Sequence, residues 1–260
     1  MHLAVEGAET FVATGGRDFD PALPCIVFLH GAGLDHSVWA LLARAFAHRG
    51  FGVLAPDLPG HGRSAGPPLS SIVALADWTA ALIDAAGVRA ARLVGHSMGS
   101  LIALETAARH PEKVTGLALI ATAAPMRVSD DLLCAARLND HAAIDMIALW
   151  GEGYRATLGG SLAPGLWMLG GAERLLERAP PGVLFADLSA CNDYRDALAA
   201  AKKVTVPATV ILGSRDLMTP LKSGRAVADA IPACRVTVLD GAGHMLMSER
   251  PDEVLAALRR

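Results

Sequence analysis

The fold of this 260-residue chain is indicated most clearly by the stretch Ala91-Arg-Leu-Val-Gly-His-Ser-Met-Gly-Ser-Leu-Ile-Ala-Leu104. This stretch begins as a short apolar strand, turns tightly at Gly95–Gly99 and continues as a helical pattern to about His110. A Gly-x-Ser-x-Gly pattern between a strand and a helix is typical of a nucleophile elbow, which raises a serine hydroxyl above a sheet. Glycines at both flanking positions remove side chains that would collide with the turn. Ser97 is therefore a candidate nucleophile, although an ordinary strand-to-helix turn can also contain a serine.

Short apolar runs alternate with helical patterns on both sides of this stretch. Such alternation is the signature of βαβ units, and strands that are apolar throughout are typical of a sheet covered on both faces. The sequence thus predicts an α/β fold with a mostly parallel sheet flanked by helices. The predicted strands are Cys25–His30, Phe51–Ala55, Ala91–Gly95, Val114–Ile120, Ala208–Leu212 and Arg235–Leu239, and helices with clear ends are predicted at Val38–Arg49, at Met98–His110 and from Pro251.

The alternation breaks after the strand that ends at Ile120 and resumes at Ala208. Between these points the chain has several helical patterns punctuated by glycine and proline, and no clear strand. We interpret residues 125–203 as a helical cap (lid) inserted into an α/β core of residues 1–124 and 204–260. A cap at this place would cover the carboxyl edge of the sheet, where open α/β folds bind ligands.

A serine nucleophile needs a base, and the base needs a carboxylate that orients it. Asp216 and His244 each follow a predicted strand, so both belong to the same carboxyl edge as Ser97. The chain order serine, acid, histidine is the order found in hydrolases of this architecture. We therefore predict Ser97, Asp216 and His244 as a catalytic triad. Asp240 is an alternative acid, and His141 in the cap is a weaker competing position.

The loop His30-Gly-Ala-Gly33 follows the first predicted strand. Acyl transfer requires two backbone N–H groups aimed at the developing oxyanion. We predict that Met98, directly after the candidate nucleophile, supplies one of these groups and that Ala32 supplies the other. His30 is interpreted as a buried histidine that ties the loop together by hydrogen bonds.

With these motifs the sequence resembles the α/β-hydrolase superfamily, near its serine esterases, lactonases and cofactor-free haloperoxidases. The resemblance covers the chain outside the cap, and it implies that the Asp57–Ser64 loop is mainly structural and that Trp39 packs in the core. A serine at position 97, where the haloalkane dehalogenases and epoxide hydrolases have aspartate, separates the chain from those families. His96 separates it from the carbon–carbon bond hydrolases. The motifs are His30–Gly33, Asp57–Ser64, Gly95–Gly99, Gly213–Pro220 and Gly241–His244, in family order.

Composition bounds the remaining possibilities. Hydrophobic residues make up 52% of the chain and charged residues 19%, which suits a sizeable core, and the net charge of −3 gives no basic footprint for nucleic acid. The first residues do not resemble a signal peptide, and no apolar run is long enough to cross a membrane, so we expect a cytoplasmic protein. The four cysteines stand singly, without metal-ligand spacing, and are interpreted as reduced thiols.

The sequence therefore predicts a serine hydrolase that cleaves a carboxylic ester or lactone of a small apolar substrate through an acyl-enzyme, without cofactor or metal. Two alternatives remain. The same triad can serve enol-lactone hydrolysis, perhydrolysis or acyl transfer, and the fold can also serve a non-enzymatic ligand receptor. Flexible apolar side chains that favour an acyl pocket lie in the cap or near the site loops: Met126, Met146, Met168, Met218, Met245, Met247, Trp150 and Trp167.

Overall fold

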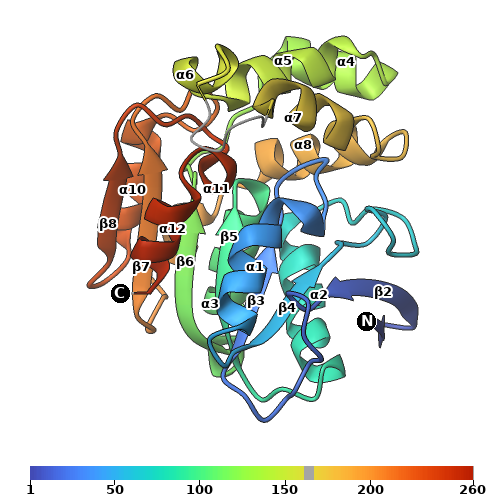
Figure 1. Ribbon diagram of the computed structural model, residues 1–260, viewed down its shortest axis with the longest axis vertical. Helices are drawn as coiled ribbons and strands as arrows, with labels where there is room; N and C mark the ends of the chain where they lie inside the picture. Colours follow the sequence, from blue (N-terminus) through green and yellow to red (C-terminus); the bar gives the residue numbers. More distant parts are fainter. Residues whose placement is uncertain (161–166, 260) are drawn as a thin grey trace.

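The computed structural model describes residues 1–160 and 167–259, and its centre is an eight-stranded sheet in the order β1-β2-β4-β3-β5-β6-β7-β8 (Figure 1). Strands β3 to β8 are parallel, whereas β1 and β2 add an antiparallel hairpin at one edge. The mostly parallel α/β fold predicted from the sequence is confirmed. The strands are β1 His2–Val5, β2 Ala8–Ala13, β3 Cys25–Leu29, β4 Gly52–Pro56, β5 Ala91–His96, β6 Val114–Ile120, β7 Ala208–Gly213 and β8 Arg235–Leu239.

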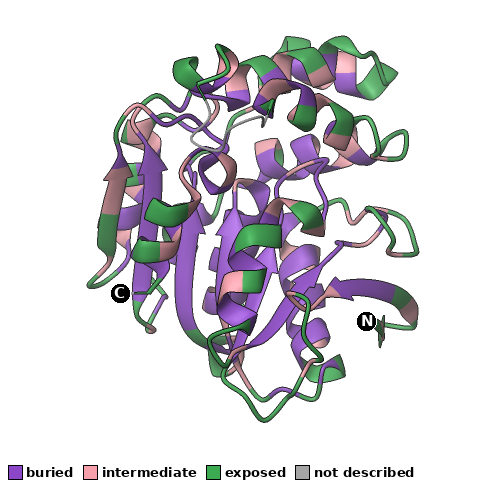
Figure 2. Cartoon of the chain, in the orientation of Figure 1, coloured by how far each residue is buried: buried purple, intermediate pink, exposed green. Residues whose placement is uncertain are grey.

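Strands β3 to β7 each contribute to two cores, because alternate side chains point to opposite faces of a sheet. In β3, Val27 and Leu29 pack in the core under α2, α3, α9 and α10, whereas Ile26 and Phe28 pack in the core under α1 and α12. Trp39 lies in the second core against Phe28, as the sequence suggested. Figure 2 shows the buried strands between these half-exposed helices.

The flanking helices and short turns have these bounds: η1 His36–Trp39, α1 Ala40–Ala47, α2 Ile72–Ala85, α3 Met98–Arg109, η2 Pro111–Lys113, α9 Ala197–Ala201, α10 Leu221–Ala230, α11 Leu246–Glu249 and α12 Pro251–Leu258. Strands β1 and β2 were not predicted from the sequence. Their burial is mixed, because they form the sheet edge, so neither carries the continuous apolar run that marks the parallel strands.

Between β6 and β7 the chain forms helices that lie across the carboxyl end of the parallel strands (Figure 1). Residues 161–166, which belong to the predicted cap, lie outside the described residues. α9 follows this layer and packs against α3 and α10 beside the sheet. Among the described residues no helix is both long and apolar enough to span a membrane. The layer consists of α4 Asp130–Leu138, α5 Ala142–Gly151, α6 Tyr154–Thr157, α7 Met168–Leu176 and α8 Val183–Asp193.

Helix α4 shows how local sequence sets these elements. The Ser129 side chain accepts a hydrogen bond from the Leu132 amide at 3.3 Å, and two aspartates in the first turn complement the helix dipole. Asn139 ends the helix in the left-handed region at φ +53°, which asparagine tolerates well. Its side-chain oxygen accepts a hydrogen bond from the Gly182 amide at 2.7 Å, which joins the end of α4 to the start of α8.

Candidate active site

Ser97 occupies the turn between β5 and α3 in a strained backbone conformation, with φ +52° and ψ −118°. Residues other than glycine rarely adopt positive φ, and such a conformation costs on the order of 1–3 kcal/mol unless the surroundings enforce it. Here they do. A Cβ atom at Gly95 would collide with the backbone of Gly99, and one at Gly99 would collide with the backbone at Leu29. The turn is therefore packed so tightly that it holds Ser97 at the carboxyl end of β5.

Asp216 and His244 come from the loops after β7 and β8 and meet in a hydrogen bond. His244 Nδ1 donates to Asp216 Oδ2 at 2.8 Å, and the Thr219 hydroxyl donates to the same oxygen at 2.5 Å. The backbone amides of Met218 and Thr219 donate to Oδ1 at 2.9 and 2.7 Å. Burial opposes ionisation of Asp216, but the charge of His244 and these hydrogen bonds hold the pKa of the carboxyl below its usual value.

The tautomer of His244 follows from this contact. Because Nδ1 donates to Asp216, the lone pair of the neutral ring lies on Nε2, and His244 lines the same cavity as Ser97. The ring of His96 packs on that of His244 with centroids 4.8 Å apart, and its Nε2 donates to the His244 carbonyl at 3.0 Å. Burial and the charge of His244 lower the pKa of His96 to about 3, so His96 is neutral. It supports the histidine loop without adding charge.

The competing positions are placed elsewhere. Asp240 is exposed and accepts a hydrogen bond from the Ser214 hydroxyl at 2.9 Å; among the described residues it makes no hydrogen bond to His244. His141 is exposed on the helical layer, where it pairs with Asp145 and Glu177 at 2.9 and 3.0 Å. The described geometry therefore joins Asp216, and not Asp240, to the candidate base.

The two predicted oxyanion donors belong to the loop after β3 and to the start of α3. Ala32 and Gly31 line the cavity together with Ser97. Met98 is fully buried and is the first residue of α3, so its N–H has no acceptor within the helix. His30 ties the Ala32 loop together: its Nδ1 donates to the Gly31 carbonyl at 2.9 Å and its Nε2 accepts from the Leu58 amide at 3.0 Å.

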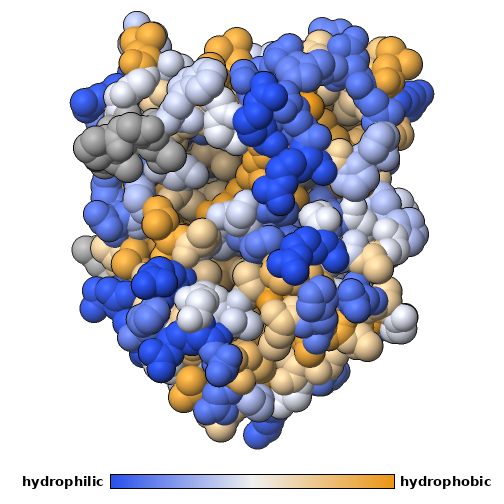
Figure 3. Space-filling model, turned by 45° about the vertical axis from the view of Figure 1, so that its right-hand side comes forward, coloured by the Kyte–Doolittle hydropathy of each residue, from blue (hydrophilic) through white to orange (hydrophobic). Residues whose placement is uncertain are grey.

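A cavity of about 230 Å³ lies between the sheet edge and the helical layer. Figure 3 shows apolar side chains in a hollow below the more hydrophilic outer face of that layer. Most of the lining is apolar, as in small-molecule sites generally. Of the methionines and tryptophans singled out from the sequence, the cavity is lined by Met126, Trp150, Met218 and Met245; Met168 and Trp167 line a neighbouring depression, Met247 is in the core, and Met146 packs among the helices.

Glu152, which the sequence analysis did not single out, also lines this cavity. It directly follows α5 and is 5% exposed, and its Oε2 has no hydrogen-bond partner among the described residues. Burial and the nearby carboxylate of Glu249 raise the pKa of Glu152 to about 8. The backbone beside it docks on the histidine loop, because the Gly151 carbonyl accepts the amides of His244 and Met245 at 2.9 and 3.0 Å. The position of Glu152, an acidic residue at the end of an apolar helical pattern, is the sequence feature that could have identified it.

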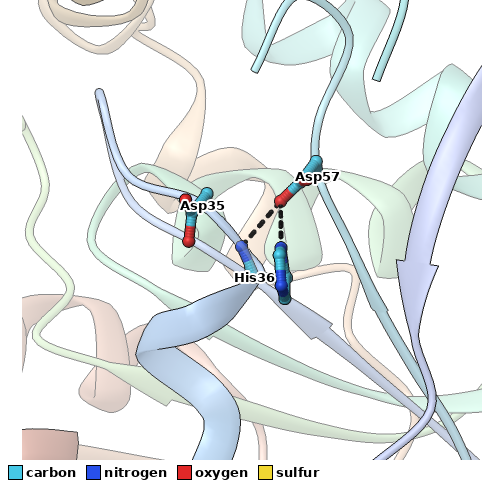
Figure 4. Close-up of side chains that lie close together, drawn as sticks. All are labelled: Asp35, His36 and Asp57. Carbon is cyan, nitrogen blue, oxygen red and sulfur yellow. Dashed lines mark hydrogen bonds and ion pairs between the residues drawn. The ribbon is translucent and has the colours of Figure 1, made fainter. Parts of the chain in front are cut away.

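Asp35, His36 and Asp57 form a cluster in which one potential ligand atom of each side chain lies within 4.8 Å of the others (Figure 4). Its carboxylate oxygens are already hydrogen-bonded. Asp57 Oδ1 accepts from the His36 amide and Nδ1 at 2.8 and 2.7 Å, and Oδ2 accepts from the Arg63 amide at 2.9 Å. Asp35 Oδ1 accepts from the Ser37 amide at 2.8 Å. We therefore interpret the cluster as a support for the Asp57–Ser64 loop.

Three comparisons place the chain among known proteins. Residues 26–257 match the profile described as "Alpha/beta hydrolase family". A pimeloyl-[acyl-carrier protein] methyl ester esterase of Chromobacterium violaceum is 35% identical over 259 residues, covering 95% of this chain and 96% of that protein. The esterase of the same name from Aromatoleum aromaticum is 32% identical, with 88% and 94% covered. The crystal structure of the enol-lactonase from Burkholderia xenovorans is 27% identical with a TM-score of 0.86, covering 100% of this chain and 98% of that one.

We expect Glu152→Gln to change how the stability of the protein depends on pH. Because the folded state holds the Glu152 proton up to about pH 8, whereas the unfolded chain releases it near 4.5, wild-type stability should fall as pH rises between these values. The total effect is on the order of a few kcal/mol. Between pH 5 and 9, the melting temperature of the variant minus that of the wild type should increase as pH rises. The exposed Glu112→Gln serves as control, and parallel curves for all three proteins would contradict the expectation.

Proposed function

The chain belongs to the alpha/beta hydrolase family and is an ester-hydrolysing enzyme, and we propose that Ser97, His244 and Asp216 carry its reaction. The observation that supports this assignment is their arrangement. A serine held in a strained turn and a histidine hydrogen-bonded to a carboxylate at 2.8 Å line or adjoin one apolar cavity. Serine, base and orienting acid are the parts that nucleophilic acyl transfer requires.

In the proposed reaction His244 Nε2 takes the proton of Ser97 as the serine oxygen attacks the ester carbonyl. Asp216 keeps the imidazole in the required tautomer and stabilises its positive charge. The N–H groups of Ala32 and Met98 bind the oxyanion, and each such donor is worth roughly 3–4 kcal/mol in the transition state. The alcohol leaves with the proton from His244. Water then attacks the acyl-enzyme by the same proton transfers, which releases the acid and restores Ser97.

For the substrate we propose a carboxylic ester with an extended apolar acyl chain and a small alcohol. The apolar cavity supports this class, and the relatives from Chromobacterium and Aromatoleum are named for a methyl ester of an acyl chain. Lactone hydrolysis on the same residues is a second candidate, favoured by the likeness to the enol-lactonase. We further propose that residues 125–203 act as the lid that selects the acyl chain, since Leu132, Leu176 and Leu188 line the cavity from this segment.

Ser97→Ala should abolish hydrolysis of p-nitrophenyl esters while the protein stays folded, because the variant lacks the nucleophilic oxygen. Intact-protein mass after treatment with a serine-reactive phosphonate should show one adduct on the wild type and none on the variant. Ser223→Ala, on α10 away from the cavity, is the matched control and should label like the wild type. A peptide map that places the adduct on Ser100 or Ser129 would contradict the assignment of the nucleophile.

Asp216→Asn should lower kcat by about 10⁴-fold with the fold preserved, because an amide favours the wrong histidine tautomer. Asp240→Asn makes the same change at the competing acid and should leave kcat near the wild-type value. Steady-state hydrolysis of one p-nitrophenyl ester, together with melting temperatures, compares the two. If Asp240→Asn is the damaging substitution, the acid has been assigned to the wrong loop.

Leu132→Ala should shift the acyl-chain preference toward longer chains, because it enlarges the cavity from the side of α4. Leu138→Ala, on the same helix but 70% exposed, is the control. For p-nitrophenyl esters of graded acyl length, the ratio of kcat/KM for long over short chains should rise about 10-fold in the first variant only. Phosphonate titration counts the folded sites in each preparation. Identical rankings in both variants would show that the lid does not select the chain.

A further inference from the structure

A buried cluster joins α8 of the helical layer to two loops of the sheet. Asp187 Oδ2 accepts a hydrogen bond from the Gly33 amide at 2.8 Å and one from His61 Nε2 at 2.7 Å. The side chains of His61 and Asp187 are each 1% exposed. The contact therefore links three segments that are distant in sequence: the loop after β3, the Asp57–Ser64 loop and a helix inserted between β6 and β7.

The hydrogen-bond partners of His61 define its charge. Its Nδ1 faces the Pro59 carbonyl at 3.0 Å and its Nε2 faces the Asp187 carboxylate. Both groups can only accept, so both ring nitrogens carry a proton and His61 is an imidazolium. Burial alone would lower the pKa of His61, but the charge of Asp187 and these hydrogen bonds raise it.

The neighbouring His30 differs from His61 in charge. The ring centroids lie 4.9 Å apart, yet His30 Nε2 accepts a hydrogen bond from the Leu58 amide, so that nitrogen carries no proton and the ring is neutral. Burial, followed by the charge of His61, lowers the pKa of His30 to about 4. The cluster thus holds one positive charge, on His61, opposite one negative charge, on Asp187.

The cluster makes hydrogen bonds to the peptide units on both sides of Ala32. The Ala32 N–H belongs to the same peptide unit as the Gly31 carbonyl, which accepts from His30 Nδ1 at 2.9 Å. The next peptide unit donates the Gly33 N–H to Asp187. Gly33 adopts φ +66°, and the side chains of Leu176 in α7 and Leu184 in α8 pack closely against it. Ala32 is therefore held between one anchor from the sheet and one from the helical layer.

We propose that Asp187 and His61 are positioning residues whose buried ion pair orients the Ala32 peptide, so that the oxyanion site is complete only when α8 is docked. The inference rests on the proposed function, because it assigns Ala32 to the oxyanion. An anchor of this kind acts on the transition state more than on the bound substrate. Its loss should therefore lower kcat and leave KM nearly unchanged.

The test compares substitutions at Asp187 with a matched change on the same helix. Asp187→Asn keeps an oxygen that can accept the Gly33 N–H but removes the charge, and Asp187→Leu removes the acceptor as well. Asp193→Asn makes the same charge change at an exposed position of α8. We expect kcat per phosphonate-titrated site to fall about 10-fold or more in Asp187→Asn and further in Asp187→Leu, below the roughly 10³-fold limit for losing a whole oxyanion donor. KM should stay within about twofold and Asp193→Asn should match the wild type.

A second variant keeps the inference testable if substitutions of Asp187 do not fold. In His61→Gln the side-chain amide can still donate to Asp187, but the positive charge is lost, so kcat should fall severalfold at constant KM. Wild-type kcat per titrated site in any folded variant of Asp187 or His61 would overturn the inference, and so would a loss that appears only in KM. These failures are distinct from failure of the proposed function, which would show as retained activity in Ser97→Ala.

Discussion

The close approach of the Gly95–Gly99 turn to the end of β3 is the constraint on which the site depends. No Cβ fits at Gly99, because the backbone of Leu29 and His30 occupies that space. This contact brings the start of α3 against the loop that follows β3, so Ser97, the Met98 amide and the Ala32 loop come together. Gly31 belongs to the same arrangement, since a Cβ there would lie 3.0 Å from His96 Nδ1. Backbone packing, rather than side-chain chemistry, thus places Ser97, the proposed nucleophile.

Hydrogen bonds define the protonation of the buried histidines near the site. His30 and His96 each face a backbone group that defines a neutral tautomer, and burial lowers both pKa values. His61 faces two acceptors and is charged. His244 faces Asp216 with Nδ1, which leaves Nε2 as the proposed base. Only this last ring combines a carboxylate partner with a place on the cavity wall beside Ser97. Protonation, and with it chemical role, follows from the partners of each ring.

The helical layer is attached to two of the loops that the proposed mechanism uses. At the end of α5, the Gly151 carbonyl accepts the amides of His244 and Met245. On α8, Asp187 accepts the amide of Gly33. The layer also supplies much of the cavity lining, Glu152 included. In the proposed function, substrate selection and the geometry of the reacting groups thus depend on the same docked helices, so a substitution that alters one is expected to alter the other.

The parallel strands, the turn around Ser97 and the candidate loops could be predicted from the sequence, because strand periodicity and glycine requirements are local properties of the chain. The sequence left two acids open, Asp216 and Asp240, and only the tertiary structure shows that Asp216 contacts His244. Thr219, Glu152 and the pair of His61 with Asp187 were not found from the sequence. Their roles depend on burial and on hydrogen bonds between distant segments, such as the contact across 126 positions from His61 to Asp187. Such contacts cannot be predicted from a local sequence pattern, because they form only when the helices pack on the sheet.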